Sequence, residues 1–173
     1  MSLMPIDPIT LEVLQTRFEE IVATMEHLLF HSGYSTILRE SYDGSAVLTD
    51  TEGHPFQSGL GIHLTPYHLT IQGILRQYPL STMREGDVFI ANDPYLTGVY
   101  HPSDIAAITP VFYGSGREPS ALRRLIAFSA SIAHKSDVGG MVPGSASGSA
   151  REIFHEGILI PGVRYWGPEG VVS

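Results

Sequence analysis

The chain has 173 residues, of which 43% are hydrophobic and only 16% are charged, a balance that excludes a disordered protein. Its formal net charge of −8 argues against a nucleic acid or an anionic membrane surface as partner. Cysteine is absent, which excludes disulfides and thiolate zinc sites, so a bound metal would need His, Asp, Glu or water. We find no apolar run that could span a bilayer and no leader, and therefore expect a cytoplasmic enzyme or subunit.

The first predicted element is a long helix that begins after Asp7, a typical N-cap residue, with Pro8 at the first helical position. Gly33 suits its C-terminal end. Apolar residues recur between them at helical spacing, at Leu11, Leu14, Phe18, Ile21, Val22, Met25, Leu28 and Leu29. This stripe predicts packing against a sheet, a partner, or both. Residues 1–3 precede a second methionine, and we interpret them as residues added for expression.

One further helix and several strands are predicted before Ala133. The helix opens at Thr65-Pro66 and continues to about Tyr78. Apolar and β-branched runs bounded by Gly, Pro or Asp predict strands over Ser45–Thr49, Gly86–Ala91, Ile105–Tyr113 and Leu122–Ala133. The last two strands are joined by the short turn 114–119 and should pair antiparallel. We therefore expect an α+β fold, with the long N-terminal helix and the second helix packed on a mixed, largely antiparallel sheet.

The amino-acid composition changes after the last of these strands. Residues 138–150 are rich in Gly and Ser, cannot pack a core, and predict a loop over a site or a linker. A short helix is expected from Ala150 to Glu156. Glu152, His155 and Glu156 would share one face of it, which we interpret as a solvated face. No closing element is predicted at the end of the chain. Residues 1–173 are expected to form a single N-terminal domain.

Acidic and histidine residues gather at one end of the predicted hairpin. If its strands pair across the turn, Asp104 comes opposite residues 130–134, and side chains so placed lie about 5 Å apart. Asp104, His134 and Asp137 would then reach one cation, with His101 nearby. Such a His and carboxylate set suits Zn, Mn or Fe. The alternative is structural, with His134 capping a strand end and Asp137 starting an Asx turn.

Three further residues are candidates for a catalytic role. Lys135 is the only lysine; it would hold a substrate carboxylate or stabilise developing negative charge, unless it is simply solvated. His63 precedes the second helix, and Asp93 ends a strand. The sequence contains neither a nucleophile elbow nor the common phosphate-binding loop. ATP, if it is used, is therefore not held here in that way.

Several blocks, in order along nearly the whole chain, resemble the N-terminal part of the hydantoinase B/oxoprolinase family, which also contains the alpha subunit of acetone carboxylase. The blocks are Asp7–Val13; Ser35, Glu40, Asp43, Ser45 and Asp50; Ile62–Leu64; Gly86–Phe89 with Asn92–Tyr95; His101–Ile105; Ala133–Met141 with Pro143–Ser145; and Glu152–Ile153 with Glu156–Ile158 and Ile160–Pro161.

The resemblance implies a subunit of a larger homo- or hetero-oligomeric complex that works with a hydantoinase A-like ATP-binding subunit. Such complexes hydrolyse cyclic amides, or carboxylate ketones, at the expense of ATP. The resembled subunit carries a divalent metal, here Zn, Mn or Fe. The residues carried over are Asp104, His134 and Asp137 as first ligands, His101 and Asp43 next, and Asp93 and His63 beside them. Lys135 departs from the family pattern of His or an aromatic residue, which would change the ring recognised if this position lies beside the substrate.

Our leading hypothesis is the metal-bearing subunit, or a piece of it, of an ATP-dependent cyclic-amide hydrolase of the N-methylhydantoinase or 5-oxoprolinase type. One alternative is a subunit of an ATP-dependent ketone carboxylase of the acetone or acetophenone type. Another is a non-catalytic assembly module that binds its partner through the first helix and the weakly charged surface.

Overall fold

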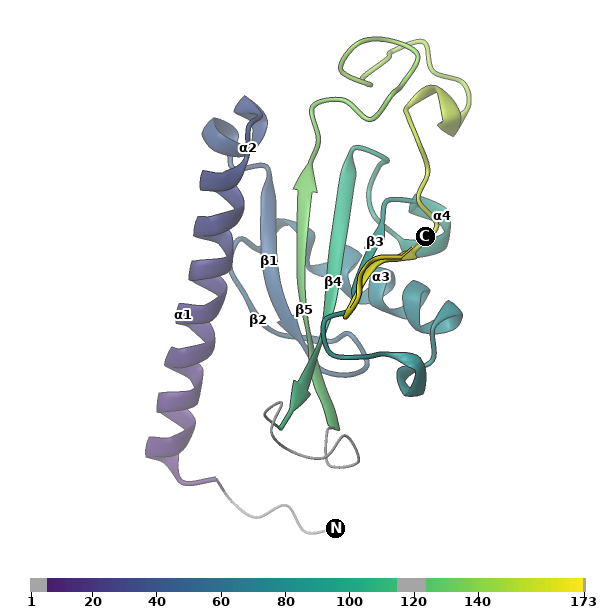
Figure 1. The fold of residues 1–173 in the computed structure, drawn as a ribbon. Coiled ribbons are helices and arrows are strands. Elements are labelled where there is room, and N and C mark those ends of the chain that lie inside the picture. Colours follow the sequence, from purple (N-terminus) through teal and green to yellow (C-terminus); the bar gives the residue numbers. More distant parts are fainter. Residues whose placement is uncertain (1–5, 115–123, 173) are drawn as a thin grey trace.

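The computed structural model describes residues 6–114 and 124–172. Its strands form one sheet in the order β2-β1-β5-β4-β3-β6-β7, with antiparallel pairs throughout. The elements (Figure 1) are α1 (Pro8–Ser32), α2 (Thr36–Ser41), β1 (Gly44–Thr49), β2 (Pro55–Ser58), η1 (Gly61–His63), α3 (Leu64–Gln77), η2 (Leu80–Thr82), β3 (Val88–Ala91), α4 (Pro94–Thr97), β4 (Asp104–Tyr113), β5 (Arg124–His134), η4 (Ile153–His155), β6 (Val163–Gly167) and β7 (Gly170–Val171). Residues 1–3 and most of the predicted turn 114–119 lie outside the described residues.

Helix α1 begins and ends where the sequence predicts. The Asp7 carboxylate accepts a hydrogen bond from the Thr10 N–H at 3.0 Å, and Gly33 follows the last helical residue. The inner face of the helix packs on one side of β1, in a cluster of Phe18, Val22, Met25, Ala46 and Leu48. Other members of the predicted stripe keep between 41% and 61% of their surface exposed, namely Leu11, Leu14, Ile21 and Leu28. The stripe therefore packs on the sheet along its inner edge and leaves an apolar row outside.

Helix α3 covers the opposite face of the sheet (Figure 1). Its side chains Tyr67, Ile71 and Ile74 are at most 1% exposed and belong to the main core. The sheet contributes Val47, Phe89, Ala106, Ile108, Phe128, Ala130 and Ile132 to that core. Strand β1 lies between the two helices and is buried at all six positions, as expected for a strand covered on both faces. The predicted α+β class is confirmed, with both predicted helices on the sheet.

The hairpin of β4 and β5 occupies the middle of the sheet. Its register pairs Asp104 with His134 at one end and Tyr113 with Arg124 at the other. The predicted meeting of Asp104 with residues 130–134 is therefore confirmed. The pairing also fixes which face each of these side chains takes, because residues along a strand alternate between the two faces.

Several parts of the chain differ from the prediction, including the unpredicted β2 and α4. The helix expected from Ala150 to Glu156 is only a 3₁₀ turn over Ile153–His155, so the expected helical face does not form. Helix α2 was not predicted, although Ser35 caps it through a hydrogen bond to its backbone. The end of the chain adds β6 and β7 at the edge of the sheet, where β6 pairs with β3. Strands β6 and β7 form through pairing at the sheet edge that no local pattern reports.

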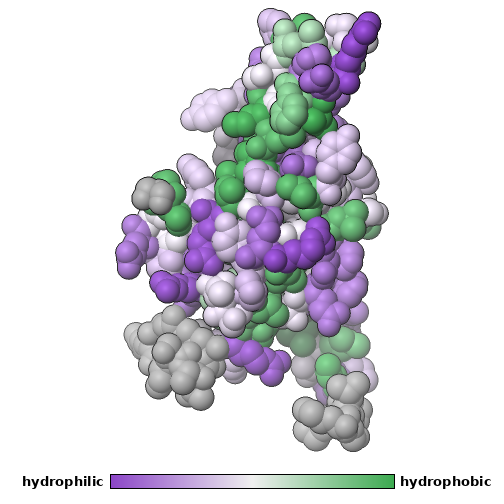
Figure 2. All heavy atoms as spheres, turned by 90° about the vertical axis from the view of Figure 1, so that its right-hand side faces the viewer, coloured by the Kyte–Doolittle hydropathy of each residue, from purple (hydrophilic) through white to green (hydrophobic). Residues whose placement is uncertain are grey.

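The segment after β5 carries exposed hydrophobic side chains. In the view from the side of α4 and the C-terminal strands, hydrophobic residues gather in the upper part of the molecule, above a band of hydrophilic ones (Figure 2). Met141, Phe154 and Ile158 are 51%, 69% and 62% exposed.

Among the helices of the described residues, none combines the length and the apolar character needed to cross a membrane.

Candidate metal centre

Five polar side chains converge at one end of the central strands. Asp104 opens β4, His134 ends β5, and Asp43 directly precedes β1. His101 lies in the turn before β4, which is closed by a 3.0 Å hydrogen bond from the Asp104 N–H to the His101 carbonyl. His63 ends η1, immediately before α3. The sheet register and the helix start therefore place groups that are far apart in the sequence around one point.

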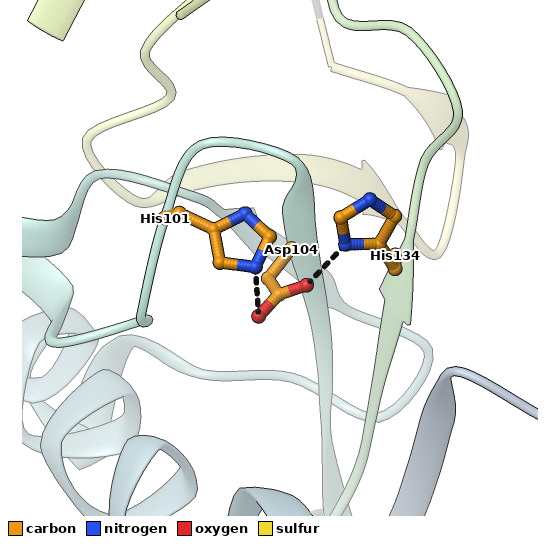
Figure 3. Close-up of side chains that lie close together, drawn as sticks. All are labelled: His101, Asp104 and His134. Atoms are coloured by element: carbon orange, nitrogen blue, oxygen red, sulfur yellow. Dashed lines mark hydrogen bonds and ion pairs between the residues drawn. The ribbon is translucent and has the colours of Figure 1, made fainter. Parts of the chain in front are cut away.

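Asp104 is the centre of this group (Figure 3). Its Oδ1 lies 3.2 Å from His134 Nδ1, and its Oδ2 lies 3.4 Å from His101 Nε2. A third imidazole, His63, brings Nε2 to 3.6 Å from Oδ2. Asp43 is more distant, with Oδ2 3.8 Å from His134 Nδ1. His101, Asp104 and His134 each offer a ligand atom within 4.8 Å of those of the other two. We refer to these three residues as the His-Asp-His cluster.

The Asp104 side chain is almost fully buried, at 2% exposure. Burial raises its pKa, but the contact with His63 and the charges of His101, His63 and His134 outweigh burial, and the pKa lies below the usual value. The group is therefore an ionised carboxylate at neutral pH. Among the described residues, its Oδ2 has no hydrogen-bond partner. A buried anionic oxygen without a hydrogen bond is costly, and a cation would compensate that cost.

His63 is held in place from behind by a buried network. The Tyr67 hydroxyl donates to the Ser45 carbonyl at 2.6 Å and accepts from the Ile132 N–H at 3.0 Å. The Ser45 hydroxyl lies 2.9 Å from His63 Nδ1. The same Ser45 hydroxyl lies 2.9 Å from the Tyr67 hydroxyl, and these contacts hold the imidazole with its Nε2 3.6 Å from Asp104 Oδ2.

The cluster has the donor set and spacing of a divalent metal site. A tetrahedral ion about 2.1 Å from its ligands separates them by about 3.4 Å. The Asp104 contacts are 3.2 Å from Oδ1 to His134 and 3.4 Å from Oδ2 to His101, and the three ligand atoms lie within 4.8 Å of one another. The side chains of His101 and His134 are 41% and 22% exposed, so one side of the cluster opens outward. Catalytic metal sites keep such an open position for water or substrate. The residues therefore fit a divalent cation.

Asp137 is not brought into the cluster. Its Oδ1 accepts hydrogen bonds from the Gly139 N–H at 2.8 Å and the Ser145 hydroxyl at 3.0 Å, and its Oδ2 accepts from the Gly144 N–H at 3.0 Å. These bonds lower the pKa of Asp137. The Ser145 oxygen in turn accepts from two more backbone N–H groups of the loop. The carboxylate organises the Gly/Ser-rich loop, which is the structural alternative that the sequence left open.

Lys135 and Asp93 also lie in other surroundings. Lys135 directly follows the last residue of β5 and lines a groove beside α1 and α2. Asp93 caps α4, accepting hydrogen bonds from two backbone N–H groups of that helix at 2.9 Å and 3.1 Å. This placement gives Asp93 a structural role, and Lys135 lines a different pocket from the one beside the cluster.

Asn92, which sequence reasoning did not select, supports the turn that carries His101. It is completely buried. Its Nδ2 donates to the carbonyls of Pro102 at 2.7 Å and Ile158 at 2.9 Å, and its Oδ1 accepts from the Ile160 N–H at 2.5 Å. One amide therefore joins the ligand turn to the segment after η4. The signals in the sequence were its position at a strand end, before an Asp-Pro pair, and its place in the Asn92–Tyr95 block of the family resemblance.

A cavity of about 420 Å³ opens beside the cluster. It is lined by His101, Ser103, His134, Gly144, Ser145, Ala146, Ser147, Gly148 and Glu156. Part of the Gly/Ser-rich loop, from Gly144 to Gly148, therefore lines this cavity. Glu156, which sequence reasoning interpreted as part of a solvated face, instead borders this cavity.

We compared the sequence and the structure of this chain with those of known proteins. Residues 7–170 match the model of a family described as Hydantoinase B/oxoprolinase. The chain belongs to the hydantoinase B/oxoprolinase family. It is 33% identical to the 5-oxoprolinase of Saccharomyces cerevisiae over 159 residues, which are 91% of this chain and 12% of the yeast protein. It is 30% identical to the beta subunit of the caprolactamase of Pseudomonas jessenii, over 93% of this chain and 26% of that relative.

A solved structure extends the comparison to the fold. The ATP-dependent caprolactamase from Pseudomonas jessenii matches this structure with a TM-score of 0.82 at 28% identity, over 97% of this chain and 28% of that chain. The resemblance seen in the sequence blocks is thus confirmed. This chain spans about a quarter or less of the length of the relatives named here.

Proposed function

We propose that this chain is the metal-holding part of a hydantoinase B-type subunit in an ATP-dependent hydrolase of cyclic amides, of the N-methylhydantoinase or 5-oxoprolinase type. The observation that carries the proposal is the buried carboxylate of Asp104 between His101 and His134. Family membership supports the reaction class, because relatives are named 5-oxoprolinase and caprolactamase. A hydantoinase A-like ATP-binding subunit as partner and a cytoplasmic location are part of the proposal.

In this proposal, His101, Asp104 and His134 hold a divalent cation, Zn, Mn or Fe, with Asp43 at the border of the site. A cation so bound polarises a carbonyl oxygen or lowers the pKa of a bound water to about 7. Ligand identity favours these ions, because imidazole and carboxylate together suit them.

Residues of the chain hold the side chains of this site in position in the absence of substrate. The antiparallel register holds Asp104 opposite His134, so their geometry does not depend on a flexible loop. His63, whose Nε2 lies 3.6 Å from Asp104 Oδ2, borders the carboxylate and helps to orient it, as partners behind a metal ligand usually do. The exposed edge of His101 leaves an approach for substrate from the cavity side.

The test is metal binding by the 173-residue chain and its variants. After removal of metal and reloading with Mn²⁺ or Zn²⁺, we expect about one ion per chain by elemental analysis and calorimetry. Asp104→Ala and His134→Ala should each weaken binding about 100-fold or more, and His63→Ala about 10- to 100-fold. His31→Ala is the matched control, because His31 stacks on His27 at the surface of α1. Equal binding by wild type and Asp104→Ala would reject the proposal.

A second candidate function is assembly without chemistry. The exposed apolar row of Leu14, Ile21 and Leu28 on α1 favours it, because rows of this kind mark interfaces. A metal-free chain that co-purifies with an ATP-binding subunit, and loses it in Ile21→Glu, would support this function instead of the first.

A further inference from the structure

The sheet face that carries α1 is left open over β3 and β4. Residues paired across strands share a face, and the register links Ala46, which packs under α1, to Ser131 and then to Ala107. On this side of β3 and β4 the side chains are half-buried, namely Val88, Ile90, Ile105, Ala107, Thr109 and Val111. In Figure 1, α3 lies behind these strands and no described helix lies in front of β4. We refer to these six side chains as the open face.

We propose that the open face docks an amphipathic helix of a partner polypeptide, and that this helix places a carboxylate beside Lys135 at one end. The six side chains are apolar except for Thr109, and a continuous apolar surface marks an interaction site. The inference goes beyond the proposed function and does not depend on a bound metal.

The position of α1 determines the kind of element that fits. Strand β4 lies two strands from β1 in the sheet, which is about 9.6 Å at the usual strand spacing. Packed helices lie about 8–10 Å apart, so a helix over β4 lies directly beside α1. An added strand finds no hydrogen-bonding edge there, because β4 is paired on both sides. The open face therefore fits a helix, whose backbone hydrogen bonds are internal.

Helix α1 supplies a side wall for this helix. Its Met25 reaches the sheet, where the sulfur lies 3.6 Å from the Ser129 hydroxyl of β5. Ile21 and Leu28, one turn to either side, border a cavity of about 380 Å³ together with Met25. They are 46% and 61% exposed. An apolar stripe on the partner helix would therefore contact α1 and the open face at once.

A groove at the start of β4 supplies the charge. Its volume of about 1260 Å³ is above the usual range for a small-molecule site. Ile105 of the open face lines it, with Phe154 and Ile158, which are 69% and 62% exposed. Lys135 also lines it, and within the described residues its ammonium has no hydrogen bond or ion pair. Asp137, the other charged residue of the lining, accepts hydrogen bonds from its own loop at both oxygens. The groove therefore complements a carboxylate.

Three synthetic helical peptides test the charge. Each has about 22 residues, a length that matches the roughly 33 Å of the ten-residue β4. They share one face of Leu and Ala and carry Glu, Gln or Lys at both ends of it. Calorimetry with the chelator-treated 173-residue chain should show the Glu peptide binding about three- to five-fold tighter than the Gln peptide. The net charge of −8 alone would favour the Lys peptide instead.

Variants of the chain separate the local charge from the apolar surface. Lys135→Gln should remove the preference for the Glu peptide, and Lys135→Glu should reverse it. Arg76→Gln is the matched control, since Arg76 is exposed on α3, across the sheet, and it should keep the preference. Ile158→Glu should weaken all three peptides about ten-fold or more. Ile9→Glu should not, because Ile9 is 72% exposed at the far end of α1.

Methyl NMR of the same proteins locates the peptide without a mutation in the sheet. The signals of Ile90 and Ile105, on the open face, should shift on binding. Those of Ile108 and Ile132, which belong to the core beneath α3, should not. Because neighbouring residues of β4 report on opposite faces, a general change of structure would move both sets.

No binding of the Glu peptide at about 1 mM, an unchanged preference in Lys135→Gln, or shifts confined to Ile108 and Ile132 would overturn the inference. Two other occupants give their own results. Dodecanoate that shifts Ile105 where the peptides do not would assign the groove to a fatty carboxylate. Shifts of Ile90 and Ile105 that follow protein concentration in the absence of peptide would assign the face to a second copy of the chain. Either result would also overturn the inference.

Discussion

Asn92 offers a sharp test of how the site is supported. It is completely buried, and its side chain serves three backbone groups from two segments. Asn92→Ala leaves the carbonyls of Pro102 and Ile158 and the N–H of Ile160 without these partners. Unsatisfied buried groups cost about 1–3 kcal/mol each. Since two of the three bonds are only partly buried, we expect a loss of about 3–5 kcal/mol in unfolding free energy.

Asn92→Asp keeps the acceptor role of this side chain and removes its donor role. The aspartate still accepts from the Ile160 N–H but turns the former donor into an oxygen that faces two carbonyls. Its loss of stability should therefore equal or exceed that of Asn92→Ala at pH 7, and should shrink as acid protonates the carboxyl group. Both variants should also weaken Mn²⁺ binding about ten-fold, because Asn92 holds the turn of His101.

Urea unfolding followed by circular dichroism measures the stability change. A loss of this size should lower the melting temperature on the order of 10 °C for a chain of this length. Gln72→Ala is the control, because its amide donates to a single carbonyl at the surface, that of Glu52, at 2.7 Å. Destabilisation of Asn92→Ala no greater than that of Gln72→Ala would refute the reasoning.

Three further outcomes are expected. Because loop N–H groups lower the pKa of Asp137, its hydrogen bonds persist at neutral pH and are lost only as pH falls through that lowered value, below 3.8; the amide shift of Gly144 reports this step. Gly73→Ala places a methyl group 2.6 Å from a backbone carbonyl of α4, whereas Gly148→Ala meets nothing within 4 Å; in thermal unfolding the first should cost about 1–3 kcal/mol and the second about 0.5 or less. Tyr67→Phe removes a buried hydroxyl with three polar contacts and should cost about 1–3 kcal/mol in urea.

For each of these three predictions, one result would contradict the reasoning. A Gly144 shift that moves at or above pH 3.8 would contradict the hydrogen-bonded state of the Asp137 carboxylate. Gly73→Ala as stable as Gly148→Ala would contradict the close approach of α3 and α4. Tyr67→Phe as stable as the wild type would contradict the network behind His63.

The features that the sequence predicted correctly depend on local chemistry. Asp7 and Pro8 mark the start of α1 because a cap and a fixed φ act on adjacent residues. The pairing of Asp104 with His134 followed from one short turn and the regular spacing of two strands. The position of Asp104 in the candidate site was therefore accessible from the sequence.

Other features required the three-dimensional packing. Lys135 is next to His134 in the sequence, but its side chain lines the groove beside α1 and α2. Asp137 has the residue type of a ligand, yet N–H groups brought by the loop occupy both of its oxygens. Asn92 joins Pro102 to Ile158 and Ile160, a contact that sequence distance hides.

The position of a bound ion tests the central claim most directly. Crystals of the 173-residue chain grown with Mn²⁺ would give an anomalous difference map at the manganese edge. The account predicts one strong peak about 2–2.3 Å from ligand atoms of His101, Asp104 and His134, and its loss in Asp104→Ala. A peak at another set of residues, such as the loop around Asp137, or no peak in a chain saturated with Mn²⁺, would contradict it.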